Sequence, residues 1–324
     1  MTQSSKQTPL PPGYRLAEYT IVRQLSVGGF SIVYLALDDD DRKFAIKEYL
    51  PRNLAARNPN GEVTVPLELD RDAFNLGLKC FFEEGRVLSA IAHPTVVRVS
   101  NFFRANHTVY MVMEYAEGRS LARELELVGG QMQERQVRKW FAALLSGLRE
   151  VHSQRLLHLD IKPANIYLRR NGVPLLLDFG AARQTLSRTA KHFAAMYTPG
   201  FAAPEQYDKD QPLGPWTDIY AIGACLYVCM GGDVPPGAKA RLASDTLVPA
   251  AKAFRHQYSR ELTELCDRCL ALRPDDRPTT VLEVQKSLQQ EAYSDPLRET
   301  AGEGNRLVGW IKGLTGGRHG KGTE

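Results

Sequence analysis

The spacing of apolar residues changes near residue 115, and this change limits the possible folds more than any single motif. From residue 19 to about 115, β-branched and aromatic runs such as "SIVYLAL" and "KFAIKEYL" alternate with Gly and Asp turns, and one helical pattern runs from about 72 to 91. From about 120 to 290 the spacing is helical, as in "RQVRKWFAALLSGLREVHSQ". We therefore predict an α+β fold, in which a small antiparallel β lobe with one main helix adjoins a larger, mainly α-helical lobe. A cleft between two unlike lobes would favour a ligand.

The length and charge of the chain agree with this arrangement. Its 324 residues are enough for two units of roughly 150 residues each. With 41 basic and 37 acidic residues the formal net charge is +4, so we expect neither nucleic acid nor a membrane surface as a partner. The N-terminus lacks an apolar run of signal-peptide type, and nowhere do 18 apolar residues follow one another. We predict a cytoplasmic protein without an integral membrane segment.

The two ends of the chain differ in composition from the part between them. Residues 1–18 are rich in Pro and Ser, and residues 289–324 are rich in Gly and charge, so we expect both segments to be flexible. Within the tail, "NRLVGWIKGL" is typical of a short amphipathic helix, for which a solvated docking segment is favoured over a membrane anchor. The predicted domain spans 19–288, divided into an N-lobe (19–115) and a C-lobe (116–288).

The cysteines favour packing over chemistry. Cys266 and Cys269 form a C-x-x-C pair, a spacing also found in metal and redox sites. They lie, however, in "ELTELCDRCLAL", whose apolar residues recur at helical spacing, and no second pair has zinc-finger spacing. We interpret them, together with Cys225 and Cys229, as buried helix residues.

A dense polar loop follows the first long helical pattern. The run "HLDIKPANI" (158–166) holds a histidine, an aspartate, a lysine and an asparagine within nine positions. Its proline argues against a helix interior, because proline lacks a backbone donor and disfavours helix at the residue before it. Apolar segments flank the run, so its polar side chains are expected on a loop held by the core, where binding and catalytic residues often lie.

Three further motifs suggest a site for phosphate and metal. "SVGGFSIVY" (26–34) lies between two predicted strands, where a turn of small residues lets backbone N–H groups approach phosphates. Lys47 in "FAIK" sits among apolar residues, an expensive place for a cation unless an anion such as a phosphate or Glu83 or Glu84 meets it. Asp178 ends the apolar run "LLLDFG", and an Asp together with Asn165 offers the hard oxygen ligands that suit magnesium.

Six motifs in a fixed order then identify a family. "FAIK", "HLDIKPAN", "LDFG", "AAPE", "TDIYAIG" and "DDRP" together resemble a eukaryotic-like (Hanks-type) serine/threonine protein kinase of the kind found in bacteria. The resemblance covers roughly residues 19–288 and implies the bilobal protein-kinase fold. It also implies an ATP- and Mg²⁺-dependent transfer of the γ-phosphoryl group to serine or threonine of protein substrates, the chain itself included.

The resemblance implies a role for each matched position. Asp160 would accept or orient the proton of the acceptor hydroxyl, and Lys162 would steady the γ-phosphate. Lys47 would hold the α- and β-phosphates and pair with Glu84, which the usual interval to "HP" selects over Glu83. Asn165 and Asp178 would bind Mg²⁺. The remaining nucleotide contacts would come from Ser26, Val27, Gly28, Gly29, Ser31, Val33, Ala45, Met113, Glu114, Ala116 and Tyr167.

Supporting roles follow from the same resemblance. Thr198 would contact Asp160 and Lys162, as in kinases that act on serine and threonine. Glu205 and Arg277 would form a buried ion pair, Asp218 would anchor the backbone of the catalytic loop, and His158 would be a hydrogen-bonded loop anchor rather than an acid or base. On this interpretation Glu205, Arg277 and Asp218 are structural, and the catalytic set is limited to Asp160, Lys162, Asn165 and Lys47.

The sequence departs from the family pattern in three places. Ser26 and Ser31 replace two of the usual phosphate-loop glycines, and because serine tolerates positive φ less well we expect altered or weakened nucleotide affinity. Leu159 replaces the arginine that usually precedes the catalytic aspartate, which predicts activity independent of phosphorylation at Thr185, Ser187 or Thr189. The stretch between Lys47 and Glu84 is unusually long; we interpret it as a hairpin-like insertion, and favour a solvated elaboration over a binding role.

Three functions remain open on the sequence alone. An active protein kinase is favoured because every expected phosphate and metal residue is present. A catalytically weak or inactive nucleotide-binding scaffold (pseudokinase) is supported by the phosphate-loop serines, and a small-molecule phosphotransferase is disfavoured because "AAPE" with Thr198 suggests a platform for an extended peptide. The family resemblance also suggests a metal-dependent protein phosphatase as an opposing partner. Substrates, the activating signal and the oligomeric state are not encoded in these motifs.

Overall fold

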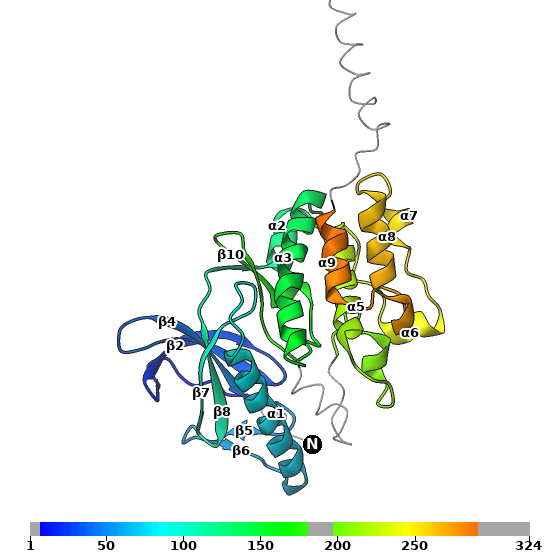
Figure 1. Ribbon diagram of the computed structural model, residues 1–324. Coiled ribbons are helices and arrows are strands. Elements are labelled where there is room, and N and C mark those ends of the chain that lie inside the picture. The colour runs from blue at the N-terminus through cyan, green and yellow to red at the C-terminus, as the bar shows by residue number, and fades with distance from the viewer. Residues whose placement is uncertain (1–6, 181–196, 291–324) are drawn as a thin grey trace, which may run out of the picture. The chain divides into compact units, whose positions relative to one another are not determined.

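The computed structural model describes residues 7–180 and 197–290 (Figure 1). Its strands are β1 (Arg15–Leu16), β2 (Tyr19–Val27), β3 (Ser31–Leu37), β4 (Lys43–Tyr49), β5 (Ala56–Arg57), β6 (Val63–Thr64), β7 (Val99–Ala105), β8 (Thr108–Glu114), β9 (Gly118–Ser120), β10 (Ile166–Arg169) and β11 (Pro174–Leu176). Its helices are α1 (Arg71–Ser89), α2 (Leu121–Leu127), α3 (Glu134–Ser153), α5 (Pro215–Cys229), α6 (Ala238–Ala243), α7 (Ala250–Ala253), α8 (Arg260–Cys269) and α9 (Val281–Gln289), with short 3₁₀ helices at Glu68–Asp70, Pro163–Asn165, Pro204–Tyr207 and Pro274–Asp276.

The N-terminal part is the predicted antiparallel sheet with one helix. Six strands pair in the order β1-β2-β3-β4-β8-β7, and every neighbouring pair is antiparallel. Helix α1 packs against β7 and β8 and buries Phe74, Phe81 and Leu88. β-branched and aromatic residues fill this core because their stiff side chains suit a half-buried pleated surface.

The C-terminal part is mainly helical, as its periodicity predicts. Helices α3 and α9 lie side by side (Figure 1), and α5 packs against α8. Helix α5 is buried on nearly all sides, which accounts for its apolar sequence "DIYAIGACLYVC". A small sheet, in the order β11-β10-β9, lies beside these helices and borders the loop 158–165.

The cysteine interpretation is confirmed for α5 and α8. Cys225, Cys229, Cys266 and Cys269 are all fully buried on these two helices. Burial raises the pKa of each thiol, so each side chain stays protonated and acts as a small apolar group. Within residues 7–180 and 197–290, no group of three or more His, Cys, Asp and Glu side chains could hold a metal ion.

The N-terminal segment differs from the expectation of flexibility over residues 1–18. Leu10 and Leu16 are each 2 % exposed and belong to the core of the sheet lobe, and β1 pairs with β2. Leu16 is held in register opposite Tyr19. Although this segment is rich in Pro, it is packed, because the burial of two leucine side chains holds it against the sheet. Residues 1–6 and the tail beyond residue 290 lie outside the described residues.

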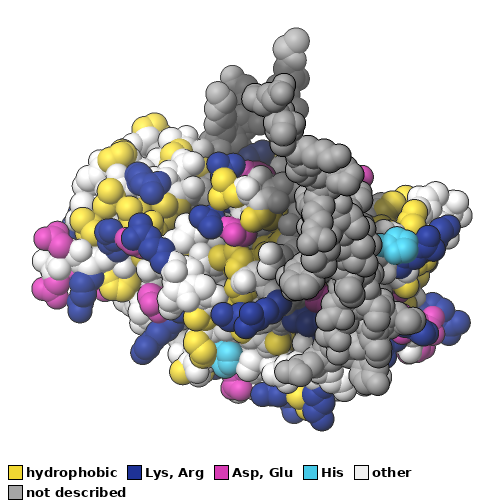
Figure 2. Space-filling model, turned by 90° about the horizontal axis from the view of Figure 1, so that it is seen from above, with side chains coloured by type: hydrophobic (Ala, Val, Ile, Leu, Met, Phe, Trp, Pro, Cys, Tyr) yellow, Lys and Arg dark blue, Asp and Glu magenta, His cyan; other side chains and the backbone are white. Residues whose placement is uncertain are grey.

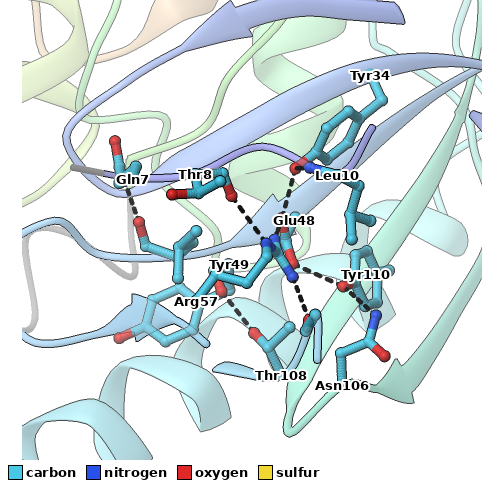
Figure 3. A network of polar contacts seen from close by, with 12 residues as sticks. Gln7, Thr8, Leu10, Tyr34, Glu48, Tyr49, Arg57, Asn106, Thr108 and Tyr110 are labelled. Atoms are coloured by element: carbon cyan, nitrogen blue, oxygen red, sulfur yellow. Dashed lines mark hydrogen bonds and ion pairs between the residues drawn. The ribbon is translucent and has the colours of Figure 1, made fainter. Parts of the chain in front are cut away.

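The insertion after β4 is a hairpin, as predicted, since β5 and β6 pair antiparallel. It is not a solvated elaboration throughout, because Leu54 and Val63 are at most 5 % exposed and join the sheet core. Arg57, on β5, reaches the buried Glu48 on β4 (Figure 3). A sequence pattern does not reveal this anchoring, because the hairpin's two strands are only two residues long.

The described surface carries mixed charge. On the face shown in Figure 2, Lys and Arg side chains are interspersed with Asp and Glu side chains, as expected from the near balance of charges. Among the helices of the described residues, none has the length and apolar character needed to span a membrane.

Candidate active site

A cavity of 230 Å³ lies where the sheet lobe meets the loop 158–165. It gathers residues from segments far apart in the chain: the β2–β3 turn, strand β4, helix α1, the polar loop and the end of the "LLLDFG" run. Its lining residues are Ser26, Val27, Gly28, Gly29, Phe30, Ser31, Val33, Lys47, Tyr49, Phe81, Glu84, Asp160, Lys162, Asn165, Asp178, Phe179 and Gly180.

Asp160 is held at the floor of this cavity by three side chains. Its Oδ1 accepts a hydrogen bond from the Thr198 hydroxyl at 3.0 Å, and its Oδ2 accepts one from the Asn165 amide at 2.9 Å. Lys162 Nζ lies 3.0 Å from Oδ2 and 3.1 Å from the Thr198 hydroxyl. The carboxylate therefore has a fixed orientation with a cation beside it, which suits it to accept a proton from a bound hydroxyl.

The backbone of the loop is held from below by Asp218 on α5. This fully buried carboxylate accepts the N–H groups of His158 at 2.9 Å and Leu159 at 2.8 Å, as the sequence predicted, and also contacts His152 Nε2 at 2.8 Å. Burial acts to raise the pKa of Asp218, but these hydrogen bonds and the histidines outweigh it and lower the pKa. Leu159 adopts φ +61°, a left-handed conformation that these two N–H bonds help to hold.

His158 is a buried loop anchor, as predicted. Its Nε2 lies 3.0 Å from the Leu177 carbonyl, and its Nδ1 lies 3.3 Å from the backbone nitrogen of Asp160. These partners select the neutral form with the proton on Nε2, so that Nδ1 can accept. Burial lowers the pKa of His158, which keeps that form in place.

Lys47 projects into the cavity between two carboxylates. Its Nζ lies 3.4 Å from Asp178 and 4.0 Å from Glu84, and its side chain is 8 % exposed. Glu83, by contrast, pairs at the surface with Arg86. The structure thus places Glu84, and not Glu83, beside the lysine.

Asp178 and Asn165 offer oxygen atoms on one side of the cavity. The Asp178 side chain is 41 % exposed at the cavity, and the Asn165 amide nitrogen is used by Asp160, which leaves the amide oxygen to act as an acceptor. One carboxylate and one amide oxygen are the kind of partial ligand set that Mg²⁺ uses together with phosphates and water. The donor chemistry therefore fits a hard divalent cation.

The turn between β2 and β3 forms the roof. Gly28 donates its N–H to the Ser31 carbonyl at 2.8 Å, which closes the turn. Ser26 lies in β2, one residue before its end, and Ser31 begins β3; neither has positive φ. The argument from positive φ for weakened nucleotide affinity therefore does not apply to these serines.

The predicted adenine contacts divide into two groups. Val33 lines the cavity, as do the turn residues. The other predicted contacts do not line the 230 Å³ cavity. They are Ala45 and Met113, which pair across β4 and β8, Glu114 at the end of β8, and Tyr167 on β10. Ala116 follows β8 and is likewise outside the lining. The cavity corresponds to the phosphate side of the predicted pocket.

Four aromatic residues of the cavity were not predicted as site residues. They are Phe30, Tyr49, Phe81 and Phe179, and the Phe81 ring centroid lies 5.5 Å from Lys47 Nζ. A signal for Phe81 was present in the sequence, because it precedes Glu84 by three residues and so shares its helix face. The alternation along β4 likewise places Tyr49 on the same face as Lys47.

A buried ion pair supports the site from the C-terminal side. Arg277 Nη1 lies 2.7 Å from Glu205 Oε1, with side-chain exposures of 0 % and 2 %, which confirms the predicted pair. Thr217 donates to the same carboxylate at 2.9 Å. This pair joins the segment after Thr198 to the end of the helical lobe.

Comparisons with known proteins agree with this geometry. A family model described as "Protein kinase domain" matches residues 19–293. A solved structure titled "PpkA-294 apo form" is 36 % identical, with a TM-score of 0.78, over 87 % of this chain and 99 % of that chain. Among curated proteins, the serine/threonine-protein kinase PknA of Nostoc sp. is 30 % identical over 86 % of this chain and 48 % of its own length, and mouse serine/threonine-protein kinase Nek1 is 31 % identical over 60 % and 16 %. The chain thus spans less than half the length of these curated relatives.

Proposed function

The chain belongs to the protein kinase family, and on this premise we propose that it transfers the γ-phosphoryl group of ATP to serine or threonine hydroxyls of protein substrates, including its own hydroxyls. The proposal rests on the arrangement at Asp160, whose two carboxylate oxygens are held within 3.0 Å of Thr198, Asn165 and Lys162. Both kinds of group that the reaction needs, a proton acceptor and cations, face one cavity.

The residues divide the chemistry between them. The acceptor oxygen attacks the γ-phosphorus, the bond to the ADP oxygen breaks, and the hydroxyl proton passes to Asp160. Lys162 would stabilise the charge on the transferred group, and Lys47, held by Glu84, would bind the phosphates that stay with ADP. Mg²⁺, bound by Asp178 and Asn165, would neutralise phosphate charge when present.

The pseudokinase alternative has less support. It drew on Ser26 and Ser31, but both lie in extended strands, where serine carries no conformational penalty. Moreover, Glu84 and Asp178 each lie within ion-pairing distance of Lys47. A chain that only bound nucleotide would need no aligned proton acceptor.

A second cavity suggests how a protein substrate is held. It has a volume of 510 Å³, and Lys162 borders both it and the first cavity. Apart from Lys162 and Glu126 its walls are uncharged, formed by residues that include Leu125, Ala164, Phe201, Val228 and Val234. A chain whose hydroxyl reaches Asp160 would pass this cavity, so we propose that the acceptor segment carries a large apolar residue close to its serine or threonine.

Regulation would not require a phosphate on the activation segment. Leu159 offers no cation to such a phosphate, and its backbone is already held by Asp218 and, through its carbonyl, by Gln206 at 3.1 Å. Thr185, Ser187 and Thr189 lie outside the described residues. Their joint replacement by alanine should leave activity intact, and a collapse of activity would contradict this. A cytoplasmic location and an opposing metal-dependent phosphatase are further proposals, and both rest on the resemblance of the sequence motifs to bacterial kinases.

Phosphate transfer from ATP and magnesium tests the main proposal. The purified chain, alone and with a generic protein substrate, is compared with Asp160→Asn and with the exposed control Asp39→Asn. Loss of a positioned base should lower the rate by about 10² to 10⁴, while the control should match wild type. If the wild-type chain binds ATP but labels no hydroxyl, the scaffold alternative replaces the kinase proposal.

A further inference from the structure

A buried ion pair lies directly behind the proposed phosphate-binding lysine. Glu48 follows Lys47 on β4, so its side chain points to the opposite face of the sheet. Its carboxylate accepts hydrogen bonds from the hydroxyls of Tyr34 at 2.7 Å and Tyr110 at 2.6 Å. Arg57 supplies the balancing charge at 2.5 Å, and the exposures of the Arg57 and Glu48 side chains are 3 % and 0 % (Figure 3). A charged group this deeply buried must be fully paired.

Arg57 also binds two segments that lie outside the kinase motifs. Its guanidinium donates to the carbonyl of Thr8 at 2.8 Å and to the carbonyl of Gly61 at 2.6 Å. Thr8 belongs to the packed N-terminal segment, which precedes the family match beginning at residue 19. One side chain therefore joins the N-terminal segment, the β5–β6 hairpin and the strand that carries Lys47, as Figure 3 shows.

The phosphate-binding turn is tied to the same assembly. The N–H of Leu50 donates to the Phe30 carbonyl at 2.9 Å, and the N–H of Arg52 donates to the Gly29 carbonyl at 2.9 Å. The carbonyl of Leu50 in turn accepts a hydrogen bond from the Gln7 side chain. The segment after β4 thus links the turn above the cavity to the N-terminal segment.

We propose that Arg57 is a positioning residue that, through Glu48 and residues 7–10, sets the positions of Lys47 and the phosphate-binding turn and thereby the affinity for ATP. This inference rests on the proposed function in taking ATP as the ligand of the cavity. Without Arg57 the buried Glu48 carboxylate has no counter-charge, so β4 must shift or admit water. Groups that bind phosphates lose much of their effect when displaced by about 1 Å. Withdrawal of residues 7–10 would act on the same contacts.

Two variants of the full chain test the inference independently. Arg57→Met removes the charge and keeps the length of the side chain, whereas deletion of residues 2–10 keeps the ion pair and removes the segment bound to it. The dissociation constant of a fluorescent ATP analogue is measured by titration, together with KM for ATP, kcat per active site and Tm. Both changes should weaken ATP binding about tenfold or more, with kcat altered much less. Arg57→Lys, which restores the charge, should recover part of the affinity.

The matched control is Arg15→Met on β1 of the same sheet, which removes an exposed ion pair with Asp39 and should leave affinity unchanged. The inference fails if Arg57→Met lowers Tm while its folded fraction binds ATP as wild type does, because Arg57 would then be purely structural. Unchanged affinity in the deletion variant would likewise show that residues 7–10 do not position the ATP site. If Arg57→Met does not fold, the deletion variant alone decides the test. Because the titration needs no phosphate transfer, a chain that binds ATP but transfers nothing overturns the proposed function alone.

Discussion

Replacing Arg277 by methionine should destabilise the fold but leave the phosphate-transfer rate of the folded protein unchanged. The Arg277 guanidinium is fully buried and donates to Glu205 Oε1 at 2.7 Å and Oε2 at 3.1 Å, and to the carbonyls of Trp216 at 3.1 Å, Ala271 at 2.7 Å and Leu272 at 2.9 Å. Methionine would fill much of the volume but leave these acceptors unpaired. The buried Glu205 carboxylate would keep a hydroxyl donor but lose its counter-charge.

The expected cost follows from that loss. Breaking a buried pair by removing one partner costs about 3 to 5 kcal/mol. In a domain of this size 1 kcal/mol lowers Tm by about 2 to 4 °C, so the variant should melt roughly 10 °C below wild type. A second change, Glu205→Gln, removes the orphaned charge, so the double variant should be more stable than Arg277→Met alone.

Denaturant unfolding and thermal melting measure the cost, and phosphate transfer at low temperature, normalised to the folded fraction, measures the chemistry. Arg260→Met, which removes an exposed pair with Glu264, is the control and should leave Tm unchanged. The reasoning is refuted if Arg277→Met melts like wild type, or if it is fully folded in the cold and still inactive. The second result would assign Arg277 a part in the reaction.

Three further predictions concern the site itself. Burial lowers the pKa of His158 below its ordinary value of 6.5, so the unfolded chain binds a proton more readily than the folded chain does. Tm should therefore stay constant above pH 6.5 and fall as the pH drops below 6.5. In a series of melts at different pH, His158→Gln should reduce this dependence of Tm on pH. Val234→Asp should lower kcat/KM about tenfold for a serine peptide with a nearby leucine, but not for the same peptide with alanine in place of that leucine. The control is Val248→Asp, because Val248 is exposed and lies outside the cavity. Glu84→Gln removes one of the two carboxylates beside Lys47 and should raise KM for ATP about tenfold, whereas Glu83→Gln at the surface should leave KM unchanged. Equal effects of the two changes in steady-state kinetics would contradict the assignment of Glu84.

The sequence predicted best where a short run of residues carries its own physical signature. Strand and helix periods located the two lobes, and the run 158–166 drew attention to Asp160 and Asn165, which the structure places at one cavity. The contact of Arg57 with Glu48 could not be predicted in this way, because it joins two strands of different sheets. The packing of residues 7–18 was missed for a similar reason. The composition predicted flexibility, but the structure of this segment depends on the burial of Leu10 against the distant core of the sheet lobe.

The two halves of the site have separate supports, and this separation can be tested. The catalytic loop is held by Asp218 on the helical lobe, whereas Lys47 is backed by Glu48 and Arg57 on the sheet lobe, and the two sets share no residue. Asp218→Asn should therefore lower kcat, and Arg57→Met should raise KM for ATP. Because distant sites without shared partners act independently, the free-energy effects of the two changes on kcat/KM should add within about 0.5 kcal/mol. A larger discrepancy in the double variant would mean that the two lobes are coupled, and that the contacts of Arg57 affect the catalytic loop as well as nucleotide binding.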